Sequence, residues 1–307
     1  MALARIAKLA IICLSGQASG MLSAVNTDSS DQQSNVTDAT ENSVEADAAR
    51  TIATPDEIDA YRGLLTGTDW PTLAHAYGSA AEAPKMLAAL IDREQSVRTR
   101  ALDYLHNTLH HQSTLYEATV PAALYVAAIL SDPRTTCTVD NNRRSFPGCM
   151  RAELLAWIAS VANEVTDEAE ALSQRYGFPL DDYPPAVGIQ RIRPLLFSAS
   201  LPYTEDTNRH VRKAALTACI PLLDDPRLHH HRRPLVPLVR EVLGTSELWQ
   251  HRERAIDALN AWGEDSSGLE GQRNPFLFCD SDLPADGSSA WLADPNSSEG
   301  YSDEPPF

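Results

Sequence analysis

The sequence lacks the motifs on which most enzymes depend. It has no glycine-rich loop of the kind that cradles phosphates and no turn that presents a nucleophile between a strand and a helix. Its five cysteines, an odd number without paired spacing, predict neither a disulfide framework nor a zinc site. No apolar run approaches the roughly 20 residues of a membrane span. We therefore expect no enzyme activity, no cofactor and no membrane-spanning segment.

The histidines do not supply a metal site by their spacing. His106 and His110 stand four residues apart, which would place both on one face of a helix. The metalloprotease version of this spacing needs a glutamate directly after the first histidine, and Asn107 stands there. The three histidines at 229–231 lie in a proline-flanked turn. We interpret both groups as solvated or hydrogen-bonded side chains.

Positive charge is scarce at the two ends of the chain. Residues 23–59 hold nine acidic residues and one basic, and residues 263–307 hold ten acidic and one basic. Both segments have few large apolar residues, so burial cannot offset the entropy lost on ordering. The sequence therefore predicts a disordered or targeting segment with an acidic linker at 1–59, a folded domain at 60–262 and a disordered acidic tail at 263–307.

The first twenty residues resemble a weak secretory signal. Arg5 and Lys8 precede a short apolar run, Leu9–Leu14, and small residues follow. Because the apolar run is short, we prefer to interpret this segment as a frayed start. A cytoplasmic protein is expected, with export as the alternative.

The middle of the chain predicts helices in pairs. Pro84 opens a helix whose Leu87, Leu90 and Ile91 have the spacing of one helical face. The segment 120–130 is apolar on nearly all sides, which is typical of a buried helix. We find no strand alternation, and we expect an all-α fold of about four to five helix pairs. Further apolar stripes are predicted at 97–109, 150–161, 189–196, 211–222, 235–242 and 248–262.

Two details interrupt this pattern. A polar insertion at about 166–188 could hold an extra short helix. Pro194 lies inside an apolar stripe, where it predicts either a kink or a late helix start.

An internal repeat supports the paired arrangement. A strong copy runs through Asp92, Val97, Arg98, Ala101 and Leu102, and the same residue types recur at Asp206, Val211, Arg212, Ala215 and Leu216. Weaker copies begin at Met150-Arg151 and His251-Arg252, and Arg212 and Arg252 are 40 residues apart. The alanine would allow two helices to approach, and the aspartate would cap the second helix. The arginine could reach that aspartate or a carbonyl of the neighbouring repeat.

This pattern resembles a HEAT-repeat protein, in which helix pairs stack because one pair cannot bury its apolar stripe alone. The segment Trp70–Thr119 carries a narrower resemblance to uncharacterised bacterial HEAT-like repeat proteins of the actinobacterial type. Ser113 stands where that resemblance would place a glycine. The resemblance implies a helical-repeat fold and no particular activity. The matching residues are Trp70, Leu73, His75–Ala80, Pro84, His111, Gln112, Thr114, Tyr116, Ala118 and Thr119.

A polar-aromatic set in this segment has two interpretations. Trp70, His75, Tyr77, His111 and Tyr116 could plug the first repeat, where a solenoid needs a cap. They could instead line a recognition groove, because tyrosine and tryptophan often anchor interfaces. Capping is the preferred interpretation, and the groove remains open.

A basic set lies near the end of the predicted domain. Arg209–Arg254 holds nine Lys or Arg residues against five Asp or Glu, and the candidate contact residues are Arg212, Arg232, Arg233 and Arg252. The segment 60–208 is net acidic, which argues against the basic concave face of a DNA glycosylase. We therefore expect a monomeric protein-binding α-solenoid, such as an immunity-type or inhibitory partner of a toxin. A nucleic-acid-binding or DNA-repair-type module that uses the basic final repeats is the alternative.

Overall fold

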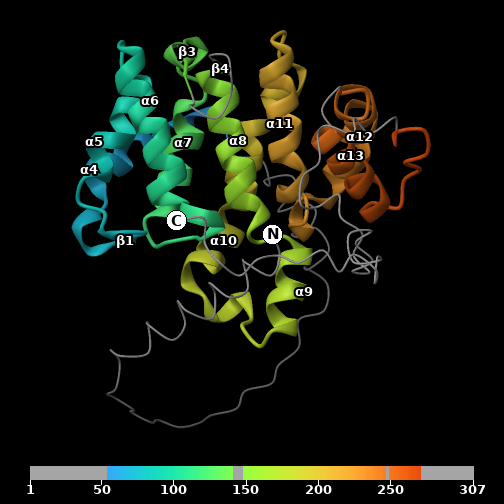
Figure 1. Cartoon of the computed structure of the whole chain (residues 1–307), viewed down its shortest axis with the longest axis horizontal. Helices are drawn as coiled ribbons and strands as arrows, with labels where there is room; N and C mark the ends of the chain where they lie inside the picture. Colours follow the sequence, from blue (N-terminus) through green and yellow to red (C-terminus); the bar gives the residue numbers. More distant parts are fainter. Residues whose placement is uncertain (1–53, 141–147, 247–248, 271–307) are drawn as a thin grey trace, which may run out of the picture.

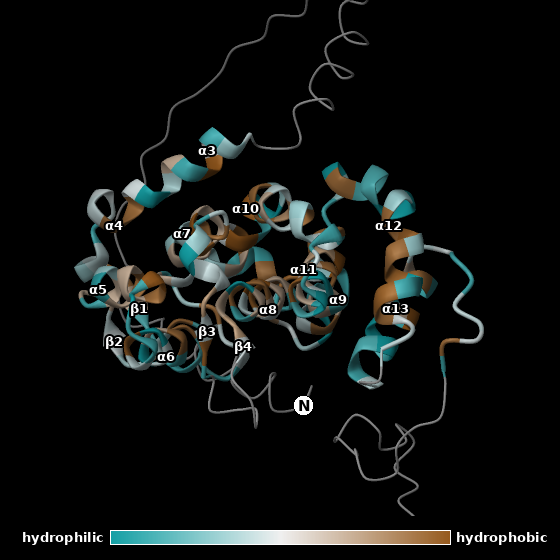
Figure 2. Cartoon of the chain, turned by 90° about the horizontal axis from the view of Figure 1, so that it is seen from above, coloured by the Kyte–Doolittle hydropathy of each residue, from teal (hydrophilic) through white to brown (hydrophobic). Residues whose placement is uncertain are grey.

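The computed structural model describes residues 54–140, 148–246 and 249–270, and these residues are mostly helical. Figure 1 shows α6, α8 and α11 side by side, and Figure 2 shows them as one row, with α7 and α10 forming a second row behind. The expectation of an all-α chain is confirmed at this level. The main helices are α5 (Ala83–Ala88), α6 (Gln95–Tyr104), α7 (Thr119–Ile129), α8 (Met150–Asn163), α9 (Asp167–Arg175), α10 (Pro184–Ser200), α11 (Arg209–Leu222), α12 (Arg232–Leu238) and α13 (Trp249–Ala261).

Short elements join or extend these helices. Two π-helical turns, η4 (Leu105–Leu109) and η10 (Val239–Leu243), continue α6 and α12. The 3-10 turns that are used below are η5 (His111–Ser113), η6 (Pro133–Thr136), η7 (Leu180–Asp182) and η9 (Pro226–His231). The N-terminal elements are α3 (Pro55–Asp59), η1 (Ala60–Gly63), α4 (Leu64–Gly67) and η2 (Trp70–Thr72), and the remaining turns are η3 (Ala89–Ile91) and η8 (Leu201–Glu205).

Two small β-hairpins interrupt the helices, although no strand was predicted. The first pairs β1 (Ala74–His75) with β2 (Gly78–Ser79), and the second pairs β3 (Thr138–Val139) with β4 (Gly148–Cys149), both antiparallel. Strands of two residues are too short to show the alternation of buried and exposed residues by which a strand is recognised in sequence.

The two rows of helices pack through small residues. Ala101 of α6 and Ala215 of α11 are buried, as the repeat predicts for its alanine position. A Cβ at Gly188 of α10 would lie 2.7 Å from Cγ2 of Val120 in α7, so a larger residue would force these helices apart. The prediction of a helix buried on nearly all sides is confirmed for α7.

Two arginines of the repeat, Arg98 and Arg151, donate to carbonyls of the turns that precede their own helices. Arg98 donates to the carbonyls of Asp92 and Arg93 at 2.8 Å each, and also to the carbonyl of Thr138 at 2.6 Å in the next helix pair. Arg151 donates to the carbonyl of Leu130 at 2.9 Å, and its Nη1 lies 3.9 Å from Asp206 Oδ2. Such contacts tie consecutive helix pairs to each other.

The repeat aspartates close turns rather than cap helices. Asp92 accepts from the backbone N–H of Glu94 at 2.8 Å, and Asp206 accepts from that of Asn208 at 2.7 Å. The N-cap residues are Glu94 and Asn208, and the side chain of Asn208 accepts from His210 N. The aspartates lie two residues too early to reach the free amides of the first helical turn, which corrects the predicted capping role.

Another pair of matching turns was not recognised in the sequence. Asp132 accepts from both the backbone and the guanidinium of Arg134, with the shortest contact at 2.7 Å. Asp225 makes the same contacts with Arg227, again down to 2.7 Å. Each turn has a proline between the aspartate and the arginine, which presets the φ angle of the turn.

The packed region extends beyond both ends of the predicted 60–262 domain. Ile58 of α3 packs against the core, within the range predicted to be disordered. After α13, Leu269 is buried and would be 2.7 Å from a Cβ at Gly244. Apart from 54–59 and 263–270, the predicted tails, the signal-like segment, Cys13 and Cys279 lie outside the described residues.

The polar insertion and the apolar stripe around Pro194 both contain helices. The predicted extra helix in the polar insertion is α9. Because α10 begins at Pro184 and contains Pro194 in its interior, the predicted late start at Pro194 is wrong. Within the described ranges, no helix combines the length and the apolar character needed to cross a membrane.

Candidate functional site

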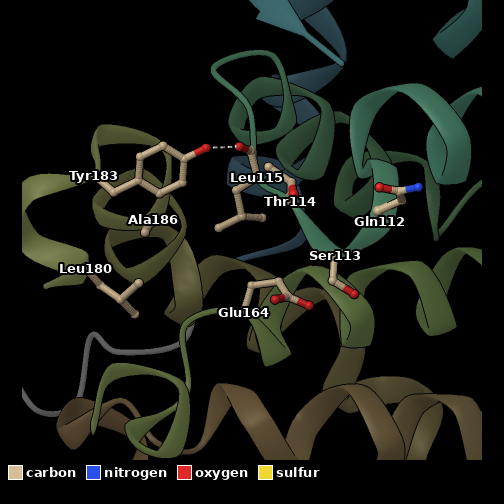
Figure 3. A pocket seen from close by; sticks show the side chains of 8 residues that line it. All are labelled: Gln112, Ser113, Thr114, Leu115, Glu164, Leu180, Tyr183 and Ala186. Atoms are coloured by element: carbon tan, nitrogen blue, oxygen red, sulfur yellow. Dashed lines mark hydrogen bonds between the residues drawn. The ribbon is translucent and has the colours of Figure 1, made fainter. Parts of the chain in front are cut away.

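A pocket opens where the segment before α7, the end of α8 and the start of α10 meet. Its volume is about 400 Å³, part of which is open to solvent, and its lining is mainly apolar. Figure 3 shows that its side chains come from three separate parts of the chain. These side chains belong to Gln112, Ser113, Thr114, Leu115, Glu164, Leu180, Tyr183 and Ala186.

The backbone on one side of the pocket is strained. Gln112 has φ 51° and ψ 45°, and Ser113 has φ 60°, so two consecutive residues other than glycine occupy the left-handed region. Each such residue costs on the order of 1–3 kcal/mol unless the surrounding structure enforces it. The π-helical turn η4 ends at Leu109, three residues before Gln112, and π-turns are frequent at functional sites.

Buried hydrogen bonds enforce this strained turn. The carbonyl of Leu105 accepts from His110 N and from Trp157 Nε1, both at 3.0 Å. Thr119, fully buried at the start of α7, donates to the carbonyl of Leu109 at 2.6 Å and accepts from Tyr116 N at 2.8 Å. These contacts fix both ends of the segment that lines the pocket.

The first β-hairpin is fastened to the same segment. Ala118 N donates to the carbonyl of Ala74 at 3.1 Å, and Ala76 N donates to the carbonyl of Thr108 at 3.2 Å. Glu117 accepts from Ala74 N at 3.0 Å. The segment Trp70–Thr119 thus forms one hydrogen-bonded unit, which we call the pocket unit.

The polar-aromatic set divides into two parts. Trp70 is buried and donates from Nε1 to the carbonyl of Leu64 at 3.1 Å. His75 is buried as well, accepts from Tyr77 N at 3.0 Å and meets the ring of Tyr104 edge-on. Both side chains therefore belong to the buried core, and the choice between a cap and a groove stays a prediction.

Of the other three members, Tyr77 is exposed, and His111 and Tyr116 are partly buried. The Tyr77 side chain is 68% exposed, and its hydroxyl lies 3.4 Å from His111 Nδ1. Burial raises the pKa of Tyr116, and the neighbouring Tyr77 adds to this effect. Because His111 and Tyr116 directly flank the pocket-lining residues 112–115, we call Tyr77, His111 and Tyr116 the aromatic rim.

A carboxylate reaches the pocket from the opposite side. Glu164, at the C-terminal end of α8, has a side chain that is 13% exposed, and its Oε1 lies 3.8 Å from Nε2 of the buried His110. The hydroxyl of Tyr183 donates to the carbonyl of Leu115, which fixes the tyrosine ring against the pocket wall. Sequence patterns missed Glu164, Leu180, Tyr183 and Ala186, since these residues are distant from the resembling segment and carry no motif of their own.

The basic set is not part of this site. Arg232 donates to the carbonyl of Leu223, with the shortest contact at 2.8 Å, and Arg252 donates to the carbonyl of Ser246. Arg212 is half-buried, whereas Arg233 is exposed. The fold therefore directs two of these four cations to backbone carbonyls.

Metal ligands, cysteines and similar proteins were the remaining clues to function. Within the described ranges, no group of three or more His, Cys, Asp or Glu side chains is placed to hold a metal ion. Cys137, directly before β3, and Cys149, within β4, are free thiols. No protein-family model matches the chain, and no similar curated protein or solved structure is found.

Proposed function

We propose that the protein is a HEAT-like α-solenoid that binds another protein through the pocket and the aromatic rim. The solenoid arrangement is supported by the two rows of helices in Figure 2 and by the contacts of Arg98 and Arg151, which bridge consecutive helix pairs. Stacked pairs of this kind bury a continuous core and form the extended concave surface that solenoids use for recognition.

One observation carries the binding function, namely the mainly apolar pocket whose lining residue Gln112 directly follows His111, which contacts the ring of the exposed Tyr77. Tyrosine offers a large contact area at a small entropic cost, because its side chain has only two rotatable angles. The rim is also pre-organised, since the hairpin that carries Tyr77 is hydrogen-bonded to Thr108 and Ala118, on either side of the pocket-lining residues 112–115. A rigid aromatic edge beside an apolar pocket is typical of an interface hot spot.

Site-specific crosslinking tests this proposal. A benzophenone amino acid replaces Tyr77 in the full chain, and the same group replaces Arg209 as a control. Arg209 is exposed at the start of α11 and belongs to neither the pocket nor the rim. In an extract of cells that make the protein, we expect one protein adduct from position 77 and none from position 209.

Competition makes the result specific. An excess of the unlabelled protein should abolish the adduct, and an excess of a Tyr77→Ala, Tyr116→Ala variant should not. Adducts to nucleic acid alone, or adducts that the double variant also removes, would contradict the proposal. Once the partner is identified, its activity with and without this protein tests the inhibitory version.

A further inference from the structure

His75 is buried in the hairpin that carries Tyr77, and its two ring nitrogens face different groups. We propose that His75 is a pH-sensitive switch. Its neutral ring holds Tyr77 in the aromatic rim, and its protonated ring turns to Glu82 and releases Tyr77. The inference rests on the proposed function for its consequence, which is weaker partner binding at acid pH, whereas the switch itself can be measured in the protein alone.

The hydrogen bond from Tyr77 requires a neutral histidine. Nδ1 of His75 accepts from the backbone N–H of Tyr77 at 3.0 Å, so Nδ1 has no proton of its own. The proton of the neutral ring is therefore on Nε2, and a second proton has to go to Nδ1. There it would meet the N–H of Tyr77, because an imidazolium has two donors and no acceptor. Protonation of His75 therefore breaks this hydrogen bond.

The loop that presents Tyr77 depends on this hydrogen bond. Ala76 and Tyr77 form the two-residue loop between β1 and β2, and such loops favour turns with a positive φ, which neither residue has. A side-chain acceptor that bonds the N–H two residues later, as in an Asx turn, supplies the hold that this loop lacks. The rest of the hairpin stays attached, since Ala76 N donates to the carbonyl of Thr108 and Ala74 N donates to Glu117. Loss of the bond should therefore release Tyr77 alone.

The protonated ring has an ion-pair partner on its other side. Oε1 of Glu82, at the N-cap of α5, lies 3.8 Å from Nε2 of His75, which is too far for a hydrogen bond but close enough for an ion pair once the ring is charged. Within the described part of the chain, no group accepts a hydrogen bond from this buried Nε2. The Glu82 side chain is 64% exposed and is free to move toward the ring. An imidazolium is therefore drawn to Glu82, whereas the neutral ring stays with Tyr77.

Two aromatic neighbours complete the surroundings of His75. The ring of Tyr104 in α6 meets His75 edge-on, and burial, with a smaller effect of Glu82, raises the pKa of Tyr104, so this phenol stays neutral. The ring of Tyr77 also lies edge-on to His75, and its hydroxyl is 3.4 Å from Nδ1 of His111. Because His111 is a second imidazole beside Tyr77, a test has to separate its titration from that of His75.

Nuclear magnetic resonance of the full chain tests the switch without a partner. Histidine rings and tyrosine amides are isotope-labelled, and His75→Asn and Tyr77→Phe assign the two signals by their loss. Between about pH 8 and pH 5, where histidines ordinarily change charge, both signals should shift with one common midpoint. Glu82→Gln should move this midpoint to lower pH, because the imidazolium loses its ion pair. Glu94→Gln, an exposed change of the same charge at the start of α6, should not.

Two histidine variants separate the switch from other effects of pH. His75→Asn keeps an acceptor at the place of Nδ1 but cannot be protonated, so the amide signal of Tyr77 should no longer shift with pH. His111→Asn removes the other imidazole and should leave the shift in place. An amide signal of Tyr77 that stays constant over this pH range, or that shifts equally in His75→Asn, would overturn the inference.

Crosslinking from position 77 then tests the consequence for binding. With the benzophenone group there, the adduct should be about threefold to tenfold weaker at about pH 5 than at about pH 8, which is the effect of losing one hydrogen bond. The same group in the His75→Asn chain should give equal yields, which controls for pH effects on the partner. An equal loss in both chains would overturn the regulatory role of His75.

The two experiments also fail separately. If the signals of His75 and Tyr77 shift together but no adduct forms at either pH, the switch stands and the proposed function is contradicted. If the adduct forms but the amide signal of Tyr77 does not follow His75, the proposed function stands and the switch is wrong.

Discussion

The pocket unit and the last two helix pairs both carry side chains suited to a partner, but the fold uses them differently. In the pocket unit, Tyr77 is exposed and strained backbone lies beside an open pocket. In the last two pairs, Arg232 and Arg252 hold the carbonyls of the turns before their own helices. A count of charged residues along the sequence therefore does not show which side chains can reach a partner. Carbonyls at the ends of helices compete with a partner for the arginine side chains.

Substitutions at the repeat alanines should give the largest effect, and they test what both regions share. Ala101 and Ala215 are 1% and 0% exposed, so Ala101→Glu and Ala215→Glu would each bury an unpaired carboxylate. We expect a loss of several kcal/mol or failure to fold, measured by urea denaturation. Arg100→Glu, an exposed neighbour, should stay within about 0.5 kcal/mol. If the urea midpoint of either alanine variant is unchanged, the helical register assigned to the two repeat copies is wrong.

The two matching aspartate turns should respond to pH in the same direction. Side-chain hydrogen bonds from Arg134, with a further one from Arg62, hold the pKa of Asp132 well below its ordinary value. Burial opposes the shift at Asp225, yet hydrogen bonds from Arg227 still lower its pKa. A lowered folded-state pKa stabilises the fold above the unfolded value, about 3.9, and this stabilisation is lost as pH falls through the folded value.

The measurement compares Asp132→Asn and Asp225→Asn at pH 7 and at pH 3. We expect losses of about 1–3 kcal/mol at pH 7, with the larger loss at Asp132, since it binds two arginines. The gap between each variant and the parent should narrow at pH 3. A gap that stays constant with pH would show that the ionised carboxylates are not the source of the stability.

The fastening of the pocket unit can be broken at one residue. Thr119→Val removes the bonds to Leu109 and Tyr116 while it keeps the shape of the side chain. We expect a loss of about 1–3 kcal/mol because a buried carbonyl loses its donor. Thr136→Val, which removes a similar bond at an exposed turn, is the control and should cost less than about 0.5 kcal/mol. Equal losses would contradict the special role of the buried threonine.

Two arginines of the basic set sharpen the comparison further. Arg252→Met should lower stability by about 1–2 kcal/mol, since the carbonyl of Ser246 loses a donor and the contact with the Trp249 ring is lost. Arg233→Met, at an exposed position, should change it by less than about 0.5 kcal/mol. Thermal unfolding of both variants measures these losses of stability. A larger loss at Arg233 than at Arg252 would contradict the structural role assigned to Arg252.

The smallest effect is expected at the strained turn, and its sign is opposite. Ser113→Gly should raise stability by about 0.5–1 kcal/mol, because glycine adopts φ 60° without a steric cost but is more flexible when unfolded. Ser131→Gly, at another exposed loop position, serves as the control and should not stabilise. Stabilisation at Ser113 combined with a weaker crosslink from position 77 would connect the strain to the pocket.

The sequence by itself determined the helices and their buried faces. The apolar spacing of Leu87, Leu90 and Ile91 predicted a buried face, and the repeat alanines are buried as their pattern required. Both signals are local, since the residues of one helical face lie three or four apart in the chain. The two-residue strands and the exact role of the repeat aspartates were beyond such patterns, because they depend on single hydrogen bonds.

Only the tertiary structure decided which side chains form the candidate site. Tyr183 and Glu164 approach the segment 112–115 because α8 and α10 pack beside α7, and nothing near them in sequence marks that contact. The same packing buries His75 but leaves Tyr77 exposed, although the two residues are almost adjacent. Periodicity fixes which face of a helix is apolar, whereas a pocket depends on contacts between distant segments, and these arise only when the helices are stacked.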